Sequence, residues 1–248
     1  MKKRNRKFKR FAVTFVVVAL FGGSVYFADT SGLLSNIIDI VSKSNTDVVS
    51  VSLDELPAYN GEAFSYVEDG LADYNLEEES WKYGYESYSS DSIGRCTTAK
   101  ALVGVETMPT EDREDISSVT PTGWENKKYD SDLVEGGWLY NRCHLIGYQL
   151  TGENDNSENL ITGTRYMNVE GMLPFENNVA EYVRESGNHV MYTVTPVYKG
   201  SNMVANGVIM EAYSVEDSGV GVNFDVYCYN VQPGIVIDYS TGLNWLEE

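Results

Sequence analysis

The chain has 248 residues, of which 42% are hydrophobic, and a formal net charge of −19. This length is sufficient for one sizeable hydrophobic core, alone or with an accessory segment. Seven of the 18 basic residues stand within the first ten positions, so the rest of the chain carries 11 basic and 37 acidic side chains, a net charge of −26. Such an acidic body repels polyanions at long range, which argues against a broad basic binding face.

The N-terminus has the composition of a targeting segment. Seven Lys and Arg residues precede Phe11–Phe27, which is nearly all apolar. Seventeen residues is short for a membrane span and long for a signal-peptide core. The sequence fits an uncleaved anchor with its basic end inside, and it also fits a signal cleaved near Gly22–Ser24. In both cases we expect the remaining residues to face outward, on the membrane or secreted.

Three regions follow from this composition. Residues 1–28 form the anchor or signal segment, residues 29–53 combine a short helix with a tether, and residues 54–248 form the folded domain. Apolar residues at helical spacing predict an amphipathic helix beside the membrane: Leu33, Leu34, Ile37, Ile38 and Val41. The tether, Ser42–Ser52, is rich in Ser, Thr and Asp.

The second half of the chain predicts an antiparallel meander. His189–Tyr198 and Phe224–Asn230 alternate between apolar and polar residues, and Val208–Tyr213 lies between them after the hairpin-type dipeptide Asn206–Gly207. Three strands in close succession favour antiparallel pairing. We therefore expect a central antiparallel sheet.

One helix is predicted between Arg165 and Ser186. Its apolar residues recur near helical spacing, and Pro174 is expected either to kink it or to start a fresh turn. With the sheet, this helix gives an α+β fold in which the helix carries polar residues inward.

Three cysteines, Cys96, Cys143 and Cys228, leave two arrangements open. One disulfide and one free thiol would allow three pairings, and three buried small apolar residues are the alternative. The absence of a C-x-x-C spacing argues against a zinc site.

Only two histidines are available as a general base. His189 begins an alternating strand, where a structural or solvent-facing role is expected. His144 is followed by a stretch rich in Asn and Glu that includes Asn159, Asn168 and Glu176. Asn168 and Glu176 are eight residues apart, which is about 80° on an α-helix, so both could face one cleft.

These residue types suit hydrolysis assisted by a hydrated cation. An amide oxygen such as that of Asn168 is a ligand for Mg²⁺, which keeps most of its waters. A histidine across the cleft could deprotonate a water near neutral pH. The alternative is that Asn159 caps a turn, Asn168 caps the helix and Glu176 lies on a solvated face.

Ordered blocks between about Ser87 and Gly242 resemble the DNA/RNA non-specific endonuclease family, in particular its streptococcal DNA-entry nuclease branch. These proteins belong to the ββα-metal (His-Me finger) superfamily. The matching blocks are Ile93-Gly94-Arg95, Pro121-Thr122-Gly123-Trp124, Asn141-Arg142-Cys143-His144-Leu145-Ile146-Gly147, Asn159-Leu160-Ile161-Thr162-Gly163-Thr164-Arg165, Met167-Asn168, Met172, Phe175-Glu176 and Tyr229-Asn230-Val231-Gln232-Pro233-Gly234.

The resemblance implies a role for each matching residue. His144 corresponds to the general base of the family's D-R-G-H motif, and Asn168 to the Asn that holds a single Mg²⁺, or Mn²⁺, largely through its water shell. Glu176 corresponds to the helical Glu that binds metal-coordinated water. Asn159 corresponds to an Asn that supports the site, and Arg95 to the Arg that stabilises charge on the phosphate.

The resemblance therefore implies a metal-dependent, sequence-non-specific endonuclease that cuts DNA, with RNA as a second substrate, and leaves 5′-phosphate ends. Because the body is acidic, we expect weak substrate binding that depends on the metal. Two residues depart from the family motif: Asn141 replaces its Asp, and Cys143 replaces its Gly. A Cys at that position indicates that the backbone there requires no positive φ.

Two other functions remain open. A surface protein that binds nucleic acid or a partner without chemistry would explain the changes at Asn141 and Cys143, although such a binder would be expected to gain basic residues. A metal-free ribonuclease would use His144 and Glu176 as an acid–base pair, but the sequence offers no second well-placed histidine.

Overall fold

The computed structural model describes residues 19–21, 24–26, 53–74 and 81–248 of the chain. The chain divides into two units, residues 1–48 and 49–248. In the first unit, strands β1 (Ala19–Phe21) and β2 (Ser24–Tyr26) pair antiparallel. The rest of the predicted membrane segment, the predicted helix over Leu33–Val41 and the tether lie outside the described residues. Among the described residues, no helix combines the length and apolar character needed to span a bilayer.

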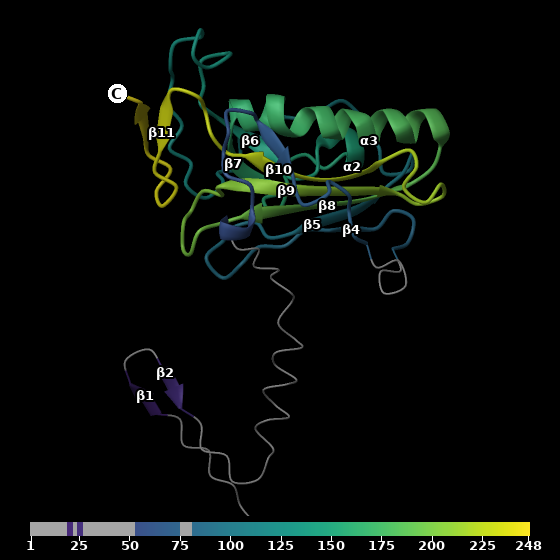
Figure 1. The fold of residues 1–248 in the computed structure, drawn as a ribbon, viewed down its shortest axis with the longest axis horizontal. Helices are drawn as coiled ribbons and strands as arrows, with labels where there is room; N and C mark the ends of the chain where they lie inside the picture. Colours follow the sequence, from purple (N-terminus) through teal and green to yellow (C-terminus); the bar gives the residue numbers. More distant parts are fainter. Residues whose placement is uncertain (1–18, 22–23, 27–52, 75–80) are drawn as a thin grey trace, which may run out of the picture. The chain divides into compact units, whose positions relative to one another are not determined.

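The second unit is built on a six-stranded antiparallel sheet with the strand order β3-β10-β9-β8-β5-β4 (Figure 1). The strands are β3 (Phe64–Tyr66), β4 (Glu86–Ser87), β5 (Ala99–Val103), β8 (Val190–Val197), β9 (Gly207–Ser214) and β10 (Asn223–Tyr229). The short 3-10 helix η1 (Leu53–Glu55) precedes them. The predicted meander is confirmed, since β8, β9 and β10 are neighbours.

The dipeptide Asn206–Gly207 is not a tight hairpin turn, and that detail of the prediction is wrong. Gly207 is the first residue of β9 and pairs with Val197 at the end of β8, so a longer loop joins the strands. A Cβ at Gly207 would lie 2.4 Å from the carbonyl oxygen of Cys228. Close packing against β10 therefore explains this glycine better than turn geometry does.

The predicted helix is confirmed, but its first part is a π-helix over Met167–Met172, which continues into α3 (Leu173–Ser186). The N–H of Leu173 donates to the carbonyl of Asn168, five residues earlier. Pro174 stands in the first turn of α3. A proline has no N–H to donate and its ring clashes with a regular helical turn before it, so the wider π turn accommodates Pro174.

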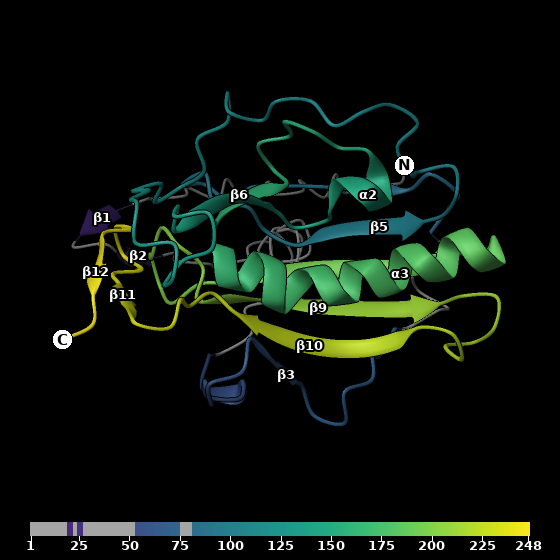
Figure 2. The same ribbon diagram turned by 90° about the horizontal axis from the view of Figure 1, so that it is seen from above.

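Helix α3 packs across one face of the sheet and closes the main core (Figure 2). Its inward residues Phe175, Val179 and Val183 share a cluster with Met210 and Val226 of the sheet. A second hydrophobic cluster is formed by other residues of the sheet, and Leu53 and Leu56, near the start of the unit, pack against it. The α+β class predicted from the sequence is confirmed.

A separate two-stranded sheet positions the polar residues. Strands β6 (Tyr140–His144) and β7 (Leu160–Thr164) pair antiparallel, with His144 opposite Leu160. The short helix α2 (Tyr148–Thr151) follows β6, and the π-helix follows β7. Near the C-terminus, β11 (Ile235–Ile237) pairs with β12 (Asn244–Leu246).

Cys96, Cys143 and Cys228 are all free and buried. The structure therefore supports three small buried residues and contradicts the alternative of one disulfide with one free thiol. Burial raises the pKa of each thiol, so all three stay protonated at neutral pH.

Candidate active site

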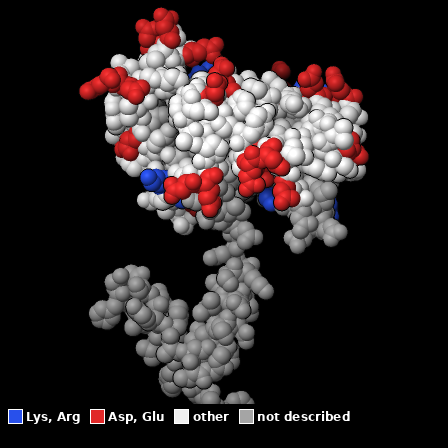
Figure 3. Space-filling model, in the orientation of Figure 1, with Lys and Arg blue, Asp and Glu red and all other residues white. Residues whose placement is uncertain are grey.

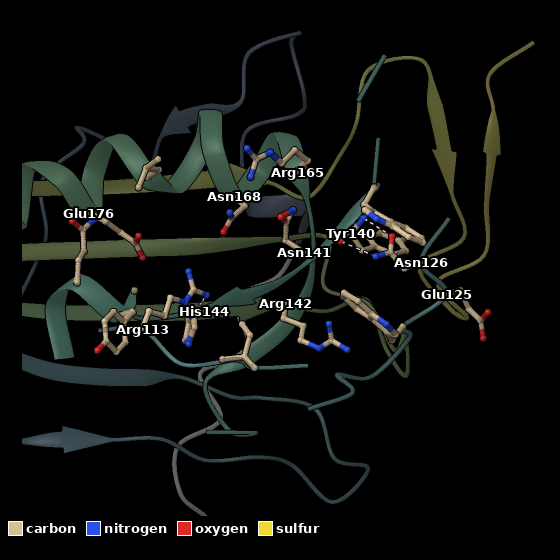
Figure 4. A pocket seen from close by; sticks show the side chains of 17 residues that line it. Arg113, Glu125, Asn126, Tyr140, Asn141, Arg142, His144, Arg165, Asn168 and Glu176 are labelled. Atoms are coloured by element: carbon tan, nitrogen blue, oxygen red, sulfur yellow. Dashed lines mark hydrogen bonds between the residues drawn. The ribbon is translucent and has the colours of Figure 1, made fainter. Parts of the chain in front are cut away.

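A cavity of about 930 Å³ brings together side chains from β6, α2, the π-helix and α3 (Figure 4). Three of the predicted site residues line it: His144 at the end of β6, Asn168 on the π-helix and Glu176 on α3. Asn141, which replaces the acidic residue of the family motif, lines it too. Residues separated by up to 35 positions in the chain therefore share one solvent-accessible space.

The hydrogen bonds of His144 define its protonation. Its Nε2 lies 2.7 Å from the carbonyl oxygen of Asn154, which can only accept, so Nε2 carries the proton. Its Nδ1 lies 3.3 Å from Nη2 of Arg113, which can only donate, so Nδ1 presents a lone pair. Burial lowers the pKa of His144 to about 4, the nearby guanidinium acts in the same direction, and the hydrogen bond to Asn154 opposes both. The imidazole is therefore neutral near pH 7, with Nδ1 as its basic atom.

The loop that carries Arg113 is tied to the elements around His144. The hydroxyl of Tyr148 on α2 donates to the carbonyl of Glu111 at 2.7 Å. The N–H of Glu114 donates to the side-chain oxygen of Asn154 at 3.0 Å. Asn154 thus orients both the imidazole and the loop, and this places the guanidinium of Arg113 in the cavity.

Asn168 is oriented by a thiol. The Sγ of Cys143 lies 3.0 Å from Oδ1 of Asn168 and, since it is protonated, donates to it. An amide oxygen has two lone pairs, so one remains for another partner. Room for Cys143 comes from Gly163 on β7, where a Cβ would lie 2.7 Å from the Cβ of Cys143.

Glu176 is a buried carboxyl, with only 8% of its surface exposed. Burial raises its pKa to about 7, while a hydrogen bond from the N–H of Gly147 and the charge of Arg113 act in the opposite direction. A Cβ at Gly147 would lie 2.6 Å from Oε2 of Glu176, so the carboxyl packs directly on the glycine backbone. The alternative that Glu176 lies on a solvated face is therefore wrong.

Asn159 lies fully buried beside the cavity and does not line it. Its Oδ1 accepts from the N–H of Ile146 at 2.9 Å, and its Nδ2 donates to the Ile146 carbonyl at 3.0 Å. Its own carbonyl accepts from the N–H of Leu145. Asn159 therefore extends the β6–β7 pairing beyond His144 and fixes the direction of the chain there.

The structure does not bring Arg95 into the cavity. Its Nε donates to Asp91 at 2.7 Å, its Nη1 donates to the carbonyls of Gly200 and Asn202, and its guanidinium stacks on Tyr198 at 4.4 Å. All these partners hold loops together. The arginines that line the cavity are Arg113, Arg142 and Arg165. Arg95, which was identified by the motif Ile93-Gly94-Arg95, therefore holds loops in place. No sequence motif identified Arg113 as a residue of the cavity.

His189 lies outside the residues that line the cavity. Its Nδ1 is 2.5 Å from Glu216, its Nε2 is 3.2 Å from Glu106, and its ring stacks on Tyr83. These contacts agree with the structural role expected from the sequence.

The donor set in the cavity fits a hydrated hard cation. Among the described residues, no group of three His, Cys, Asp or Glu side chains is arranged to hold a metal ion. The cavity instead offers the free lone pair of the Asn168 amide and the carboxyl of Glu176. Mg²⁺ suits so sparse a set because it retains several waters and takes one or two protein ligands. A cation here would also favour the charged form of a carboxyl that burial otherwise disfavours.

Comparison with known proteins places the chain in a family. Residues 74–216, more than half of the chain, match the family described as DNA/RNA non-specific endonuclease. A deoxyribonuclease of Streptococcus dysgalactiae subsp. equisimilis is 31% identical over 129 residues, which are 50% of this chain and 36% of that protein. The chain thus spans about a third of the length of that relative.

Two solved structures share the fold. NucA from Streptococcus agalactiae with magnesium bound superposes with a TM-score of 0.68 at 24% identity, covering 89% of this chain and 98% of NucA. The Sda1 nuclease with bound zinc gives a TM-score of 0.63 at 24% identity, covering 75% of this chain and 97% of Sda1. With the sequence match over residues 74–216, these findings establish that the chain belongs to the DNA/RNA non-specific endonuclease family.

Proposed function

We propose that this chain is a metal-dependent endonuclease that hydrolyses the phosphodiester bonds of DNA, and of RNA, without sequence preference and leaves 5′-phosphate ends. One observation carries the proposal: His144, Asn168 and Glu176, from three separate elements, line a single cavity together with Arg113. The family membership supports the reaction class, and the contacts in the cavity support a role for each residue.

His144 acts as the general base through Nδ1. Its lowered pKa leaves it neutral at physiological pH, so the lone pair on Nδ1 is available to take a proton from the attacking water. The Nε2–H bond to the carbonyl of Asn154 holds the ring in this tautomer. The same bond favours the imidazolium that forms once Nδ1 is protonated.

Arg113 binds the scissile phosphate. Its guanidinium lies against Nδ1 of His144, where a phosphate near the base would also be within its reach. A guanidinium can donate two parallel hydrogen bonds to phosphate oxygens and so stabilise the charge that develops on them. Moving towards the phosphate would also free the lone pair of Nδ1. This assignment replaces the one made for Arg95 from the sequence.

Asn168, and Glu176 through water, would hold Mg²⁺ or Mn²⁺ in the cavity. When bound, such an ion supplies electrostatic stabilisation of charge on the phosphoryl and leaving oxygens. The magnesium-bound state of NucA supports this choice of ion. Cys143 orients the amide of Asn168, and Gly147 donates to the carboxyl of Glu176.

Because the surface around it is acidic, we expect the cavity to be the part of the protein that binds the substrate. On the face of the second unit seen in Figure 3, most of the charged side chains are acidic. Against that background, Arg113, Arg142 and Arg165 line the cavity. Cations that contact phosphates carry no direct sequence information, which fits a non-specific enzyme. We expect binding to weaken with salt and to depend on the bound cation.

The basic and apolar N-terminal sequence supports a location on the outer face of the membrane or in the extracellular space. An outward-facing, non-specific nuclease would meet extracellular nucleic acid. This part of the proposal rests on the sequence of residues 1–28 alone.

Cleavage of supercoiled plasmid by the purified full chain tests the proposal. We expect nicking and linearisation in Mg²⁺, none in EDTA, and nicks that DNA ligase seals without kinase treatment, because they carry 5′-phosphate and 3′-hydroxyl ends. Replacing the base, His144→Ala, should lower the rate at least about a hundredfold. His189→Ala is the matched control, since His189 does not line the cavity.

Three results would overturn the proposal. Cleavage that persists in EDTA would show that the reaction needs no metal. An unchanged rate in His144→Ala would show that His144 is not the general base. DNA retention without any Mg²⁺-dependent cleavage would favour a binding protein that has lost its chemistry.

A further inference from the structure

The part of the cavity away from Glu176 is rich in aromatic side chains and also carries Arg142 and Glu125. Trp124, Trp138 and Tyr140 line it, together with Arg142. In Figure 4, Tyr140 lies on the opposite side of the cavity from Glu176. None of these aromatic side chains is needed for the chemistry assigned to His144. Tyr140 is buried in a small core cluster, so the two tryptophans are the rings that call for a separate explanation.

Each tryptophan of this region is paired with a cation. The ammonium of Lys128 lies 4.9 Å from the ring centre of Trp138, and the guanidinium of Arg142 lies 4.6 Å from that of Trp124. Arg142 is fixed there by the backbone carbonyls of Ser117 and Val119. Alternating aromatic and cationic groups are what proteins use to bind single-stranded nucleic acid, since bases stack on rings while cations meet phosphates.

The two tryptophans differ in how they are held. Trp124 is partly buried and packs against a small core cluster. Trp138 is 49% exposed although it lines the cavity. A single half-exposed ring is ordinary on a protein surface, but a ring that lines the cavity is accessible to a ligand bound there. Trp138 is therefore the stacking candidate, while Trp124 serves mainly to support Arg142.

The position of Trp138 in the sequence limits its distance from His144, the proposed general base. Trp138, Tyr140, Arg142 and His144 occupy alternate positions up to the end of β6, and all four line the cavity. At about 3.3 Å per residue, six residues of extended chain span at most about 20 Å. A nucleotide on Trp138 would thus be a few positions away from the scissile phosphate on the same strand.

We infer that Trp138, with Lys128, forms a subsite that stacks an unpaired base of the substrate strand, a few nucleotides from the phosphate beside His144. This inference rests on the proposed function. A base inside a duplex already stacks on its neighbours, so only single strands, frayed ends or extruded bases can use the subsite. Single-stranded substrates should therefore depend on Trp138, and fully paired ones should not.

Steady-state cleavage of two labelled substrates by the full chain tests the inference. One is a single-stranded oligonucleotide without self-complementarity, and the other is the same sequence annealed to its full complement as a blunt-ended duplex. For the single strand, Trp138→Ala should raise KM about tenfold or more, with kcat nearly unchanged, since stacking on one side chain is worth that much. Trp138→Phe should restore most of the loss. KM for the duplex should stay the same.

Trp245 provides a matched control because it is 48% exposed on β12 and does not line the cavity. Trp245→Ala should leave both substrates unaffected. Binding can be measured apart from cleavage by fluorescence anisotropy on the His144→Ala chain in Mg²⁺. With one abasic nucleotide moved along the single strand, binding should weaken at one position, and Trp138→Ala should abolish that dependence.

The outcomes separate this inference from the proposed function. An unchanged KM for the single strand in Trp138→Ala, or an equal rise for the duplex, would overturn the subsite while cleavage still supported the enzyme. A chain that never cleaves but shows a Trp138-dependent abasic effect would overturn the enzymatic proposal and support the subsite.

Discussion

The thiol of Cys143 lies 3.0 Å from the amide oxygen of Asn168 and orients that amide by donating a hydrogen bond to it. Cys143 itself is fully buried, next to Met172 of the π-helix. One of the two residues that depart from the family motif is thus a hydrogen-bond donor to the residue proposed to hold the metal. Its side chain fits because Gly163 of β7 has none, and a Cβ there would lie 2.7 Å from the Cβ of Cys143.

Removing that donor should weaken metal binding without removing the base. In Cys143→Ala the amide of Asn168 loses one hydrogen bond, worth about 1 kcal/mol, so the Mg²⁺ concentration for half-maximal cleavage should rise about fivefold. Cys143→Ser keeps a donor and should lie closer to the wild type. A Mg²⁺ titration of plasmid cleavage measures this, and identical curves for Cys143→Ala and the wild type would contradict it.

A methyl group at Gly147 should displace the carboxyl of Glu176. Gly147 has φ −61° and ψ 145°, which alanine adopts without strain, so the effect of Gly147→Ala comes from its Cβ alone. That atom would lie 2.6 Å from Oε2 of Glu176. We expect cleavage to fall at least about tenfold, as a misplaced catalytic group commonly costs more than that.

A double-mutant cycle checks this origin. In a Glu176→Ala background the clash no longer exists, so Gly147→Ala should change neither the rate nor the melting temperature further. Additive effects of the two substitutions would show that Gly147 matters for another reason.

Much of this fold could be predicted because its elements have regular periods. The alternation over His189–Tyr198 gave β8, and the helical spacing after Arg165 gave the helix that carries Asn168 and Glu176. The π turn at Met167–Met172 is invisible to such spacing. Its effect on the rotation between Asn168 and Glu176 was therefore missed, although both still reach the cavity.

The residues that could not be predicted depend on tertiary contacts of loops. Arg113 stands in an irregular acidic stretch and enters the cavity only because Tyr148 and Asn154 fix its loop. Arg95 sits in a recognisable motif and pairs with the nearby Asp91, but the carbonyls that fix its Nη1, those of Gly200 and Asn202, are more than 100 positions away. Local sequence carries no sign of these distant contacts.

The two arginines can be distinguished by matched substitutions. Arg113→Ala should lower kcat/KM for plasmid about a hundredfold, the usual cost of losing one donor to a transition-state charge. Arg113→Lys should recover only part of it, because an ammonium cannot bind phosphate bidentately. Arg95→Ala should leave the rate nearly unchanged and lower the melting temperature, since it removes charge-assisted hydrogen bonds of about 1.5–3 kcal/mol each. Loss of activity in a fully folded Arg95→Ala would reverse the assignment.

The buried carboxyl of Glu176 should make stability depend on pH in a predictable direction. Its pKa is raised from 4.5 to about 7 in the folded chain, so the folded state binds more protons than the unfolded state between these values. Stability associated with Glu176 is therefore fully present below about pH 4.5 and is lost as the pH rises through about 7. The whole shift corresponds to roughly 3 kcal/mol.

Glu176→Gln removes this dependence because the amide does not titrate. In EDTA, the variant and the wild type should melt at similar temperatures near pH 4.5, and the variant should melt several degrees higher at pH 8. Taking the difference at each pH cancels other titrating groups such as Asp225, whose pKa is also raised to about 7. The same substitution should reduce cleavage, since it removes the charge proposed to attract the cation. A melting difference that is equal at pH 4.5 and pH 8 would show that the Glu176 carboxyl keeps its ordinary pKa in the folded protein.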